Sequence, residues 1–421
     1  MKIIFRILEN LKNKSKEGKG FLGSQRSLIS AIDTFVRSPS CVTLRAPHIR
    51  DATDLKRFMF VVVFALLPCT LFGIWNTGRS AYLSIGDVDY TFWQAFLEGS
   101  LHVVPLIILS YAVGGLCEGI FAQVRGHEIA EGFLVTGLLY PLICPPTIPW
   151  WMFVSGIVFG VIIGKEVFGG TGQNILNPGL TARAFLFFAY PAAMSGDVWV
   201  VKPIEKLSDG SLIPSSWTTI STSKINAFIQ GTAQSVDGFS GATSLLIAEE
   251  NLPGIDSVLN LHNTYSTYDM FIGLMPGSIG ETSVLMCLIG AIILIVTGVG
   301  SWRTMLGVLS GALITSILFN YGATDASPTS FFISPIEHLL MGGFAFGAIF
   351  MATDPVTSPM HNRSKLIYGF LIGVLCILIR LINPAFPEGM MLSILFMNIF
   401  AALIDHYVIK GVQQGRLFRA K

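Results

Sequence analysis

Long apolar stretches constrain this chain more than any other feature of its sequence. A helix needs about 20 mostly apolar residues to cross roughly 30 Å of hydrocarbon, and half-helices buried among neighbours need fewer. Charged residues make up only 13% of the 421 residues, against roughly 25% in an ordinary soluble domain. We therefore expect an all-α integral membrane protein of about ten transmembrane helices. The expected segments are 58–75, 101–124, 132–144, 150–168, 179–194, 284–299, 303–320, 336–352, 365–382 and 389–409.

The third and fifth segments, 132–144 and 179–194, are short and bordered by proline or glycine. Each can span the bilayer or enter and leave it on the same side, and the sequence leaves both possibilities open. If the number of spans is even, both ends of the chain lie on the same side of the membrane.

The two ends of the chain carry most of its basic residues. Residues 1–57 hold twelve Lys or Arg against five acidic residues, and the tail 410–421 is also basic. The positive-inside rule places such segments in the cytoplasm. The leader is not a signal peptide, because Arg6 and Glu9 interrupt its first apolar run. Apolar residues at helical spacing between 28 and 36 instead predict a short amphipathic helix on the membrane surface.

The polar stretch 195–283 is then expected outside the cytoplasm. It holds nine acidic residues and three lysines, a bias that points the same way. The chain's net charge of +1 gives no reason to expect a nucleic-acid partner. Its six cysteines are scattered without a C-x-x-C pair, so neither zinc nor an iron–sulfur cluster is indicated.

The expected membrane segments 58–194 and 284–409 resemble each other internally. In each, a P-x-T-x-P motif precedes one span, which runs to an Asn-Pro pair followed by a further span. Two units of five spans each have opposite orientations, which is the inverted-repeat architecture of many transport proteins. A chance echo of proline and glycine in apolar sequence is the alternative. The motifs begin at Pro145 and Pro355, and the pairs at Asn177 and Asn383.

The most specific motif is D-G-F-S-G-A-T-S at residues 237–244, inside the loop expected outside the cytoplasm. It matches the pattern at which a flavin transferase moves FMN from FAD onto a threonine, here Thr243. A hydroxyl can form a phosphoester, the small neighbours leave room for a bulky ring, and a charged phosphate needs water rather than hydrocarbon. Asp237, Ser240, Gly241 and Ala242 complete the expected flavin-attachment motif. The alternative is a flexible loop whose threonine is merely solvated.

Further motifs extend this match over most of the chain. They are A-P-H-I-R-D at 46–51, G-G-L-C-E at 114–118, K-E-V-F-G-G-T-G at 165–172, P-G-S-I-G-E at 276–281, M-A-T-D-P at 351–355 and N-P-A-F-P-E-G-M-M at 383–391. Together they resemble the B subunits of sodium-translocating NADH:quinone oxidoreductases and, more loosely, the D subunits of Rnf complexes. The long basic leader and the overall length favour the former.

The resemblance implies a translocase subunit that conducts electrons within a six-subunit complex of the bacterial inner membrane, with the loop 195–283 in the periplasm. NADH would be oxidised by one of five partner subunits and not by this chain, in which no G-x-G-x-x-G motif follows a strand. Electrons would pass to covalent FMN on Thr243, to non-covalent riboflavin and then to ubiquinone, coupled to export of Na⁺. A flavin transferase would be needed for maturation.

Four further residues match positions that this family uses. Glu118 and Asp405 are acidic residues within apolar segments, where carboxylates are costly and usually functional, and the resemblance implies a role in sodium uptake. Their structural alternatives are a hydroxyl-capped Glu118 and an Asp405 paired with His406. Gly114 and Gly115 match a position linked to quinone binding, for which close helix packing is the ordinary explanation.

Two rival functions stay open at this stage. A passive channel or secondary transporter would explain the repeat and the broken helices, and it would need no flavin. An Rnf-type D subunit would use ferredoxin rather than quinone as the partner of its complex. For Arg183, Arg380 and the pair Lys165–Glu166, ion pairing or snorkelling is the expected role, and a fixed counter-charge for a flavin semiquinone is the alternative. Asp354, before a proline, is expected to belong to a helix cap or turn, and its position near the membrane leaves a polar path as the alternative.

Overall fold

The computed structural model describes residues 55–84, 89–125, 132–196, 198–201, 205–206, 212–213, 243–249, 261–262, 264–324, 327–383 and 388–420. The expected leader helix lies outside the described residues. So do Asp237, Ser240, Gly241 and Ala242 of the flavin-attachment motif.

Helices form nearly all of the regular structure that is described. The first membrane segment contains α4 (Leu55–Ser84), α5 (Phe92–Arg125), α6 (Phe133–Leu142), α7 (Trp150–Ile162) and α8 (Pro178–Ala189). The second contains α13 (Val284–Val296), α14 (Trp302–Tyr321), α15 (Pro335–Leu340), α16 (Phe344–Phe346), a π-helical turn (Gly347–Met351), α17 (Asn362–Ile382) and α18 (Met390–Ala420). Between them lie α10 (Ser244–Glu249), α12 (Thr267–Ile272) and the antiparallel strand pair β1 (Glu205–Lys206) and β2 (Leu212–Ile213).

Six described helical stretches are long and apolar enough to cross a membrane: Phe58–Ser84, Phe92–Arg125, Trp150–Phe168, Trp302–Tyr321, Asn362–Ile382 and Met390–Arg419. The apolar helices α6 and α13 are shorter. The segments expected at 179–194 and 336–352 are a 12-residue helix, α8, and a broken stretch from α15 to Met351. The described residues therefore confirm a helical membrane protein with six candidate spans, whereas the ten-helix inverted repeat stays a prediction.

The break in the stretch after α15 occurs at two glycines. Gly342 has a φ of +62°, a left-handed conformation that glycine adopts without steric cost. The interruption leaves carbonyl groups without helical partners, and the Arg380 guanidinium on α17 donates to those of His338 and Met341. Non-helical backbone is tolerated in a membrane protein when other protein groups satisfy it in this way.

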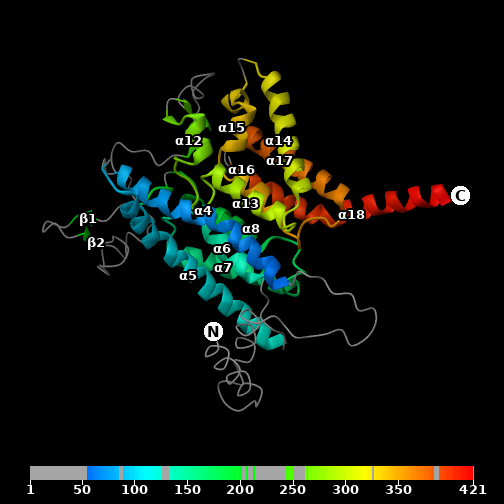
Figure 1. Cartoon of the computed structure of the whole chain (residues 1–421), viewed down its shortest axis with the longest axis horizontal. Helices are drawn as coiled ribbons and strands as arrows, with labels where there is room; N and C mark the ends of the chain where they lie inside the picture. Colours follow the sequence, from blue (N-terminus) through cyan, green and yellow to red (C-terminus); the bar gives the residue numbers. More distant parts are fainter. Residues whose placement is uncertain are drawn as a thin grey trace, which may run out of the picture.

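Glycines allow the second membrane segment to pack closely. α14 and α17 lie side by side (Figure 1). A Cβ added to Gly311 on α14 would lie 2.1 Å from the Phe370 carbonyl oxygen, and one added to Gly373 on α17 would lie 2.2 Å from that of Val308. Small residues at such positions let membrane helices approach backbone to backbone.

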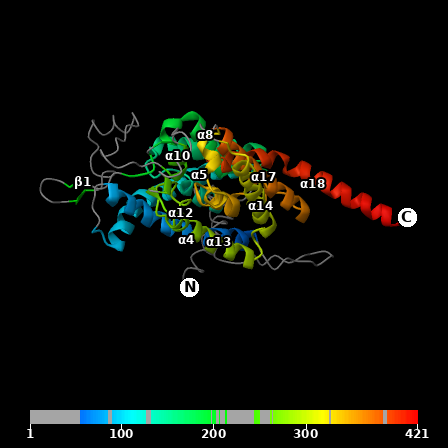
Figure 2. The ribbon, with the colours of Figure 1, turned by 90° about the horizontal axis from the view of Figure 1, so that it is seen from above.

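The two membrane segments also contact each other through the first helix of each. α4 packs along α5 and against α13, where Cys69 Sγ lies 3.8 Å from Cys287 Sγ. α18 leaves this helical body, and its last turns project beyond the other helices toward the C-terminus (Figures 1 and 2).

Candidate functional site

Thr243 stands immediately before α10 and caps its first turn. Its hydroxyl oxygen accepts a hydrogen bond from the Leu246 N–H at 3.3 Å, and its carbonyl accepts one from Ile247 at 3.0 Å. Threonine is a favoured residue at this position because its side-chain oxygen satisfies a free N–H group. Ser244 and Leu245 are buried, so the chain after Thr243 is anchored in the protein body while Thr243 itself is half-buried.

Thr243 lines a cavity of about 340 Å³. This volume lies within the roughly 300–1,000 Å³ typical of sites for small molecules and cofactors. Apolar wall residues include Phe187 at the end of α8, Met194 and Trp199, while Glu281 and Glu388 contribute carboxylates. The walls come from both membrane segments and from the connection between them.

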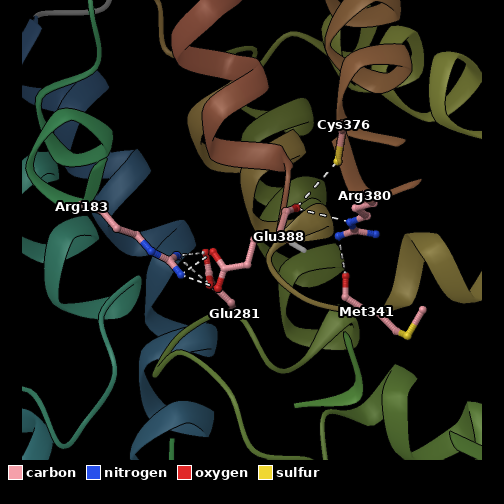
Figure 3. A network of polar contacts seen from close by, with 6 residues as sticks. All are labelled: Arg183, Glu281, Met341, Cys376, Arg380 and Glu388. Carbon is pink, nitrogen blue, oxygen red and sulfur yellow. Dashed lines mark hydrogen bonds and ion pairs between the residues drawn. The ribbon is translucent and has the colours of Figure 1, made fainter. Parts of the chain in front are cut away.

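Arg183 on α8 joins the two carboxylates of this cavity. Its Nη1 lies 3.1 Å from Glu281 Oε2, and its Nη2 lies 2.6 Å from Glu388 Oε1 (Figure 3). The arginine and Glu281 side chains are each 4% exposed, and that of Glu388 is 20% exposed. These contacts link three separate parts of the chain: α8, the turn before α13 and the turn before α18. Buried charges are costly without partners, so the arginine and the two glutamates favour the fold in which these parts meet.

Arg380 approaches the same cavity from α17, and its contacts are with backbone rather than carboxylates. It donates to the carbonyls of His338 and Met341, the latter at 3.0 Å, and from Nε to the Glu388 carbonyl at 3.3 Å (Figure 3). Within the described part of the chain, no carboxylate oxygen lies within ion-pair distance of this guanidinium. Ion pairing is therefore confirmed for Arg183. Arg380 is 3% exposed and has carbonyl acceptors from the broken helix, so ion pairing or snorkelling, the role expected of it, is wrong.

Two glycines of the cavity wall, Gly342 and Gly343, stand where a side chain would collide with neighbouring residues. A Cβ on Gly342 would lie 2.5 Å from Leu245 Cδ1 and 3.4 Å from Arg380 Nη2, and one on Gly343 would lie 2.6 Å from Glu281 Oε1. Gly342 thus lies between Leu245 and the Arg380 guanidinium.

The environment of Glu281 changes its acidity. Burial raises the pKa of the Glu281 carboxyl to about 7, although the nearby Arg183 guanidinium acts in the opposite direction and lowers it.

The structure places Glu118 in a different region, beside Lys165. The Lys165 ammonium contacts Glu118 Oε1, and both side chains are buried. Next to this pair, Arg125 Nη1 lies 3.0 Å from Glu166 Oε2. The expected ion pairing of Lys165 and Glu166 is confirmed, although each has a partner on α5 rather than its sequence neighbour. The sodium role of Glu118 stays a prediction.

Gly114 and Gly115 lie one turn before Glu118 on α5. A Cβ on Gly114 would lie 2.3 Å from Phe133 Cζ, whereas one on Gly115 would lie 3.8 Å from that ring. Gly114 therefore allows the first residue of α6 to pack against α5, as the close-packing alternative expects. A quinone role for these glycines stays a prediction, and neither of them nor Glu118 lines the Thr243 cavity.

Asp405 connects α18 to the start of α17. Its two carboxylate oxygens accept hydrogen bonds from the backbone N–H groups of Met360, at 2.6 Å, and His361, at 3.1 Å. The expected alternative, a pair with His406, is not the contact that forms. The N–H groups at a helix start lack helical partners, so Asp405 has a structural role there, and a sodium role stays a prediction.

A smaller cavity of about 60 Å³ lies between Asn177-Pro178 and Asp354-Pro355. Asn177 caps α8 through the Gly179 N–H, and its amide lies 3.4 Å from Asp354 Oδ2. Asp354 also accepts from Thr357 at 3.0 Å and from the Val356 N–H at 3.3 Å. The expected turn role of Asp354 is confirmed. Over the described residues, no cluster of three or more His, Cys, Asp or Glu side chains suits a metal ion.

Sequence patterns assign no role to Glu281 and Glu388, which the fold brings to Thr243. The two glutamates occur within the motifs at 276–281 and 383–391. The one sequence signal that could have identified these glutamates is an acidic residue in a short turn beside an apolar segment. The partner arginine lies 98 residues from one glutamate and 205 from the other, so their meeting depends on the tertiary structure.

Comparisons with known proteins match nearly the whole chain to one family. A family model described as the NQR2, RnfD, RnfE family matches residues 42–414. Proteins named as the B subunits of Na(+)-translocating NADH-quinone reductases are similar to this chain. The protein from Ectopseudomonas mendocina is 44% identical over 415 residues, covering 93% of this chain and 94% of the relative. Those from Chromohalobacter salexigens and Azotobacter vinelandii are 43% and 41% identical, covering 93% and 99% of this chain and 91% and 99% of the relatives. The chain therefore belongs to the NQR2, RnfD, RnfE family.

Proposed function

We propose that this chain is the B-type membrane subunit of a sodium-translocating NADH:quinone reductase and carries covalent FMN on Thr243. The names of its relatives and the six candidate spans support a translocase subunit that works with partner subunits. The observation that carries the flavin proposal is the cavity of about 340 Å³ that Thr243 lines. It offers a flavin apolar walls and a hydroxyl for attachment.

The residues present fit such a group. Attachment would form a bond between the Thr243 oxygen and the FMN phosphorus of FAD, with AMP leaving and the hydroxyl proton passing to a base of the transferase. Phe187, Met194 and Trp199 would exclude water from the ring, as apolar walls do in cofactor sites. The attached flavin would supply electron transfer, and the protein would supply position and fixed charges.

The remaining parts of the proposal follow the family. Electrons would arrive from a partner subunit and leave through non-covalent riboflavin to ubiquinone, with Gly114 and Gly115 near the quinone. Sodium would pass near Glu118 and Asp405. The Lys165 ammonium would have to move from Glu118 before a sodium ion could take its place. The chain would lie in the bacterial inner membrane as two inverted repeats, with cytoplasmic termini and Thr243 on the periplasmic side.

A denaturing gel viewed under ultraviolet light tests the flavin proposal. The full chain, expressed with a flavin transferase, is expected to fluoresce, and Thr243→Ala is expected to abolish the signal. Thr267→Ala, an exposed threonine at the start of α12, is the matched control and should remain fluorescent. Peptide mass across residues 225–260 should show one added FMN.

Colourless wild-type protein made with a competent transferase would contradict the proposal and favour a transporter without flavin. The Rnf-type alternative differs in its electron partner. Sodium-stimulated quinone reduction by the purified intact complex, driven by NADH, would decide against it, whereas dependence on ferredoxin would support it.

A further inference from the structure

Four charged side chains, three of them buried, lie beside the cavity that Thr243 lines. They are Arg183, Arg380, Glu281 and Glu388, and we refer to them as the four-charge cluster. Glu388 connects the two arginines, because its carboxylate contacts Arg183 and its backbone carbonyl accepts from Arg380, and Arg183 in turn contacts Glu281 (Figure 3). The two glutamates line the cavity directly. Charge of both signs is therefore fixed at a site that is otherwise largely apolar.

The two arginines are held differently. Arg183 has a carboxylate on each of its terminal nitrogens. Arg380 is 3% exposed and donates to three backbone carbonyls, without a carboxylate at ion-pair distance among the described residues. Carbonyl dipoles solvate a cation without cancelling its charge. The positive charge of Arg380 is therefore balanced less directly than that of Arg183.

Arg380 lies close to the anchored end of the Thr243 segment. Its Nη2 would be 3.4 Å from a Cβ on Gly342, and Leu245 Cδ1 would be 2.5 Å from that same Cβ. Gly342, Leu245 and Thr243 all line the cavity. A single glycine of the cavity wall thus lies between the guanidinium and the cavity.

We propose that the four-charge cluster sets the reduction potential of the flavin borne by Thr243. This inference rests on the proposed function. Reduction adds negative charge to the ring, and in a low-dielectric site that charge interacts strongly with fixed neighbours. The Arg380 cation lowers the free energy of the reduced flavin, and the Glu388 carboxylate raises it. Because the charges are held in place by hydrogen bonds, the protein needs little rearrangement when the electron arrives.

The competing explanation is that the cluster only holds the two membrane segments together. Loosening the structure would then move the potential in the same direction whichever residue is changed, since both variants admit water to the cavity. The charge explanation instead predicts shifts of opposite sign for Arg380 and Glu388. Buried charges are screened little by salt, so the shifts should persist at high ionic strength.

The test is a spectroelectrochemical titration of the covalent flavin in the purified complex. Arg380→Met is expected to lower its midpoint potential, displacing the redox equilibrium about tenfold toward the oxidised ring, or about 59 mV for one electron. Glu388→Gln is expected to raise the potential by a similar factor. Glu388 is chosen over Glu281 because it contacts both arginines, Arg183 through its carboxylate and Arg380 through its carbonyl.

Conservative variants separate charge from packing. Arg380→Lys and Glu388→Asp keep their charges and are expected to stay close to the wild-type potential. Arg416→Met, on the exposed end of α18, removes a cation far from the cluster and should change nothing. If Arg380→Met does not accumulate as folded protein, the comparison of Glu388→Gln with Glu388→Asp still tests the sign.

Shifts in the same direction for Arg380→Met and Glu388→Gln, or no shift in either, would overturn the inference. In-gel fluorescence of each variant reports separately whether Thr243 carries flavin. An unmodified wild-type protein therefore contradicts the proposed function, whereas a modified protein with unmoved potentials contradicts the cluster alone.

Discussion

At the scale of single residues, the absence of a side chain shapes the Thr243 cavity as much as the charges do. Gly343 has an ordinary negative φ of −80°, so its need for glycine comes from space and not from backbone conformation. The space is taken by Glu281, whose Oε1 would lie 2.6 Å from an added Cβ. Gly343 thereby fixes where the carboxylate can meet Arg183.

Gly343→Ala is expected to push Glu281 away from Arg183 and to destabilise the protein by about 1–3 kcal/mol, the usual cost of overpacking a filled site. Thermal unfolding of the purified chain in detergent measures the change. Gly411→Ala on α18, where an added Cβ meets nothing within 4 Å, is the matched control and should be neutral or slightly stabilising. Equal unfolding temperatures for Gly343→Ala and wild type would show that Glu281 has room to move.

At the scale of helices and turns, ion pairs connect elements that are distant in the sequence. α5 contributes Glu118 and Arg125, and the turn after α7 contributes Lys165 and Glu166. The Glu118–Lys165 pair is buried on both sides, whereas the Arg125 side chain is 31% exposed. Removing one partner should therefore destabilise the protein more at the Glu118–Lys165 pair than at the Arg125–Glu166 pair, because the former's charges have less access to water.

Lys165→Met is expected to destabilise the protein by about 3–5 kcal/mol, since it removes the cation that a buried carboxylate faces. The double variant Lys165→Met with Glu118→Gln should recover most of this loss, and Arg125→Met should cost less than Lys165→Met. The yield of folded protein and its thermal unfolding provide the measurement. A double variant as unstable as Lys165→Met alone would rule out charge as the reason for the pairing.

At the scale of the whole molecule, both membrane segments combine long helices with shorter or broken ones. α6 and α8 in the first segment, and α13 and the stretch from α15 to Met351 in the second, are shorter than a full span. Short helices buried among longer neighbours suit a protein in which sites form inside the bilayer. The proposed inverted arrangement of the two segments predicts which surfaces face each side of the membrane.

Single cysteines at Thr267 and Gln414, both exposed positions, test this orientation in a chain whose Cys41 is replaced by serine. The other five cysteines are buried and unpaired. A membrane-impermeant maleimide added to spheroplasts is expected to label position 267 directly and position 414 only after permeabilisation. Labelling of both positions from the same side would contradict the inverted repeat with cytoplasmic termini.

The sequence by itself determined the properties that depend on local composition and spacing. Apolar length predicted ten spans, and six of these segments are long enough in the described structure to cross a membrane. Proline and glycine predicted where helices end, and Asp354 before a proline predicted a turn. The motif around Thr243 and the distributed family motifs predicted the relationship that the comparisons bear out. These properties are readable because a helix period, a cap or a short motif involves residues close together in the chain.

The tertiary structure decided which distant side chains meet. Arg183 pairs with Glu281 and Glu388, Arg380 binds the carbonyls of a broken helix, and Asp405 binds the backbone before α17 rather than its neighbour His406. The partner of a buried charge depends on which helices pack together, and that packing depends on small residues such as Gly311 and Gly373 at their contacts. Charge pairing over such separations has no local signature, so only the folded arrangement reveals it.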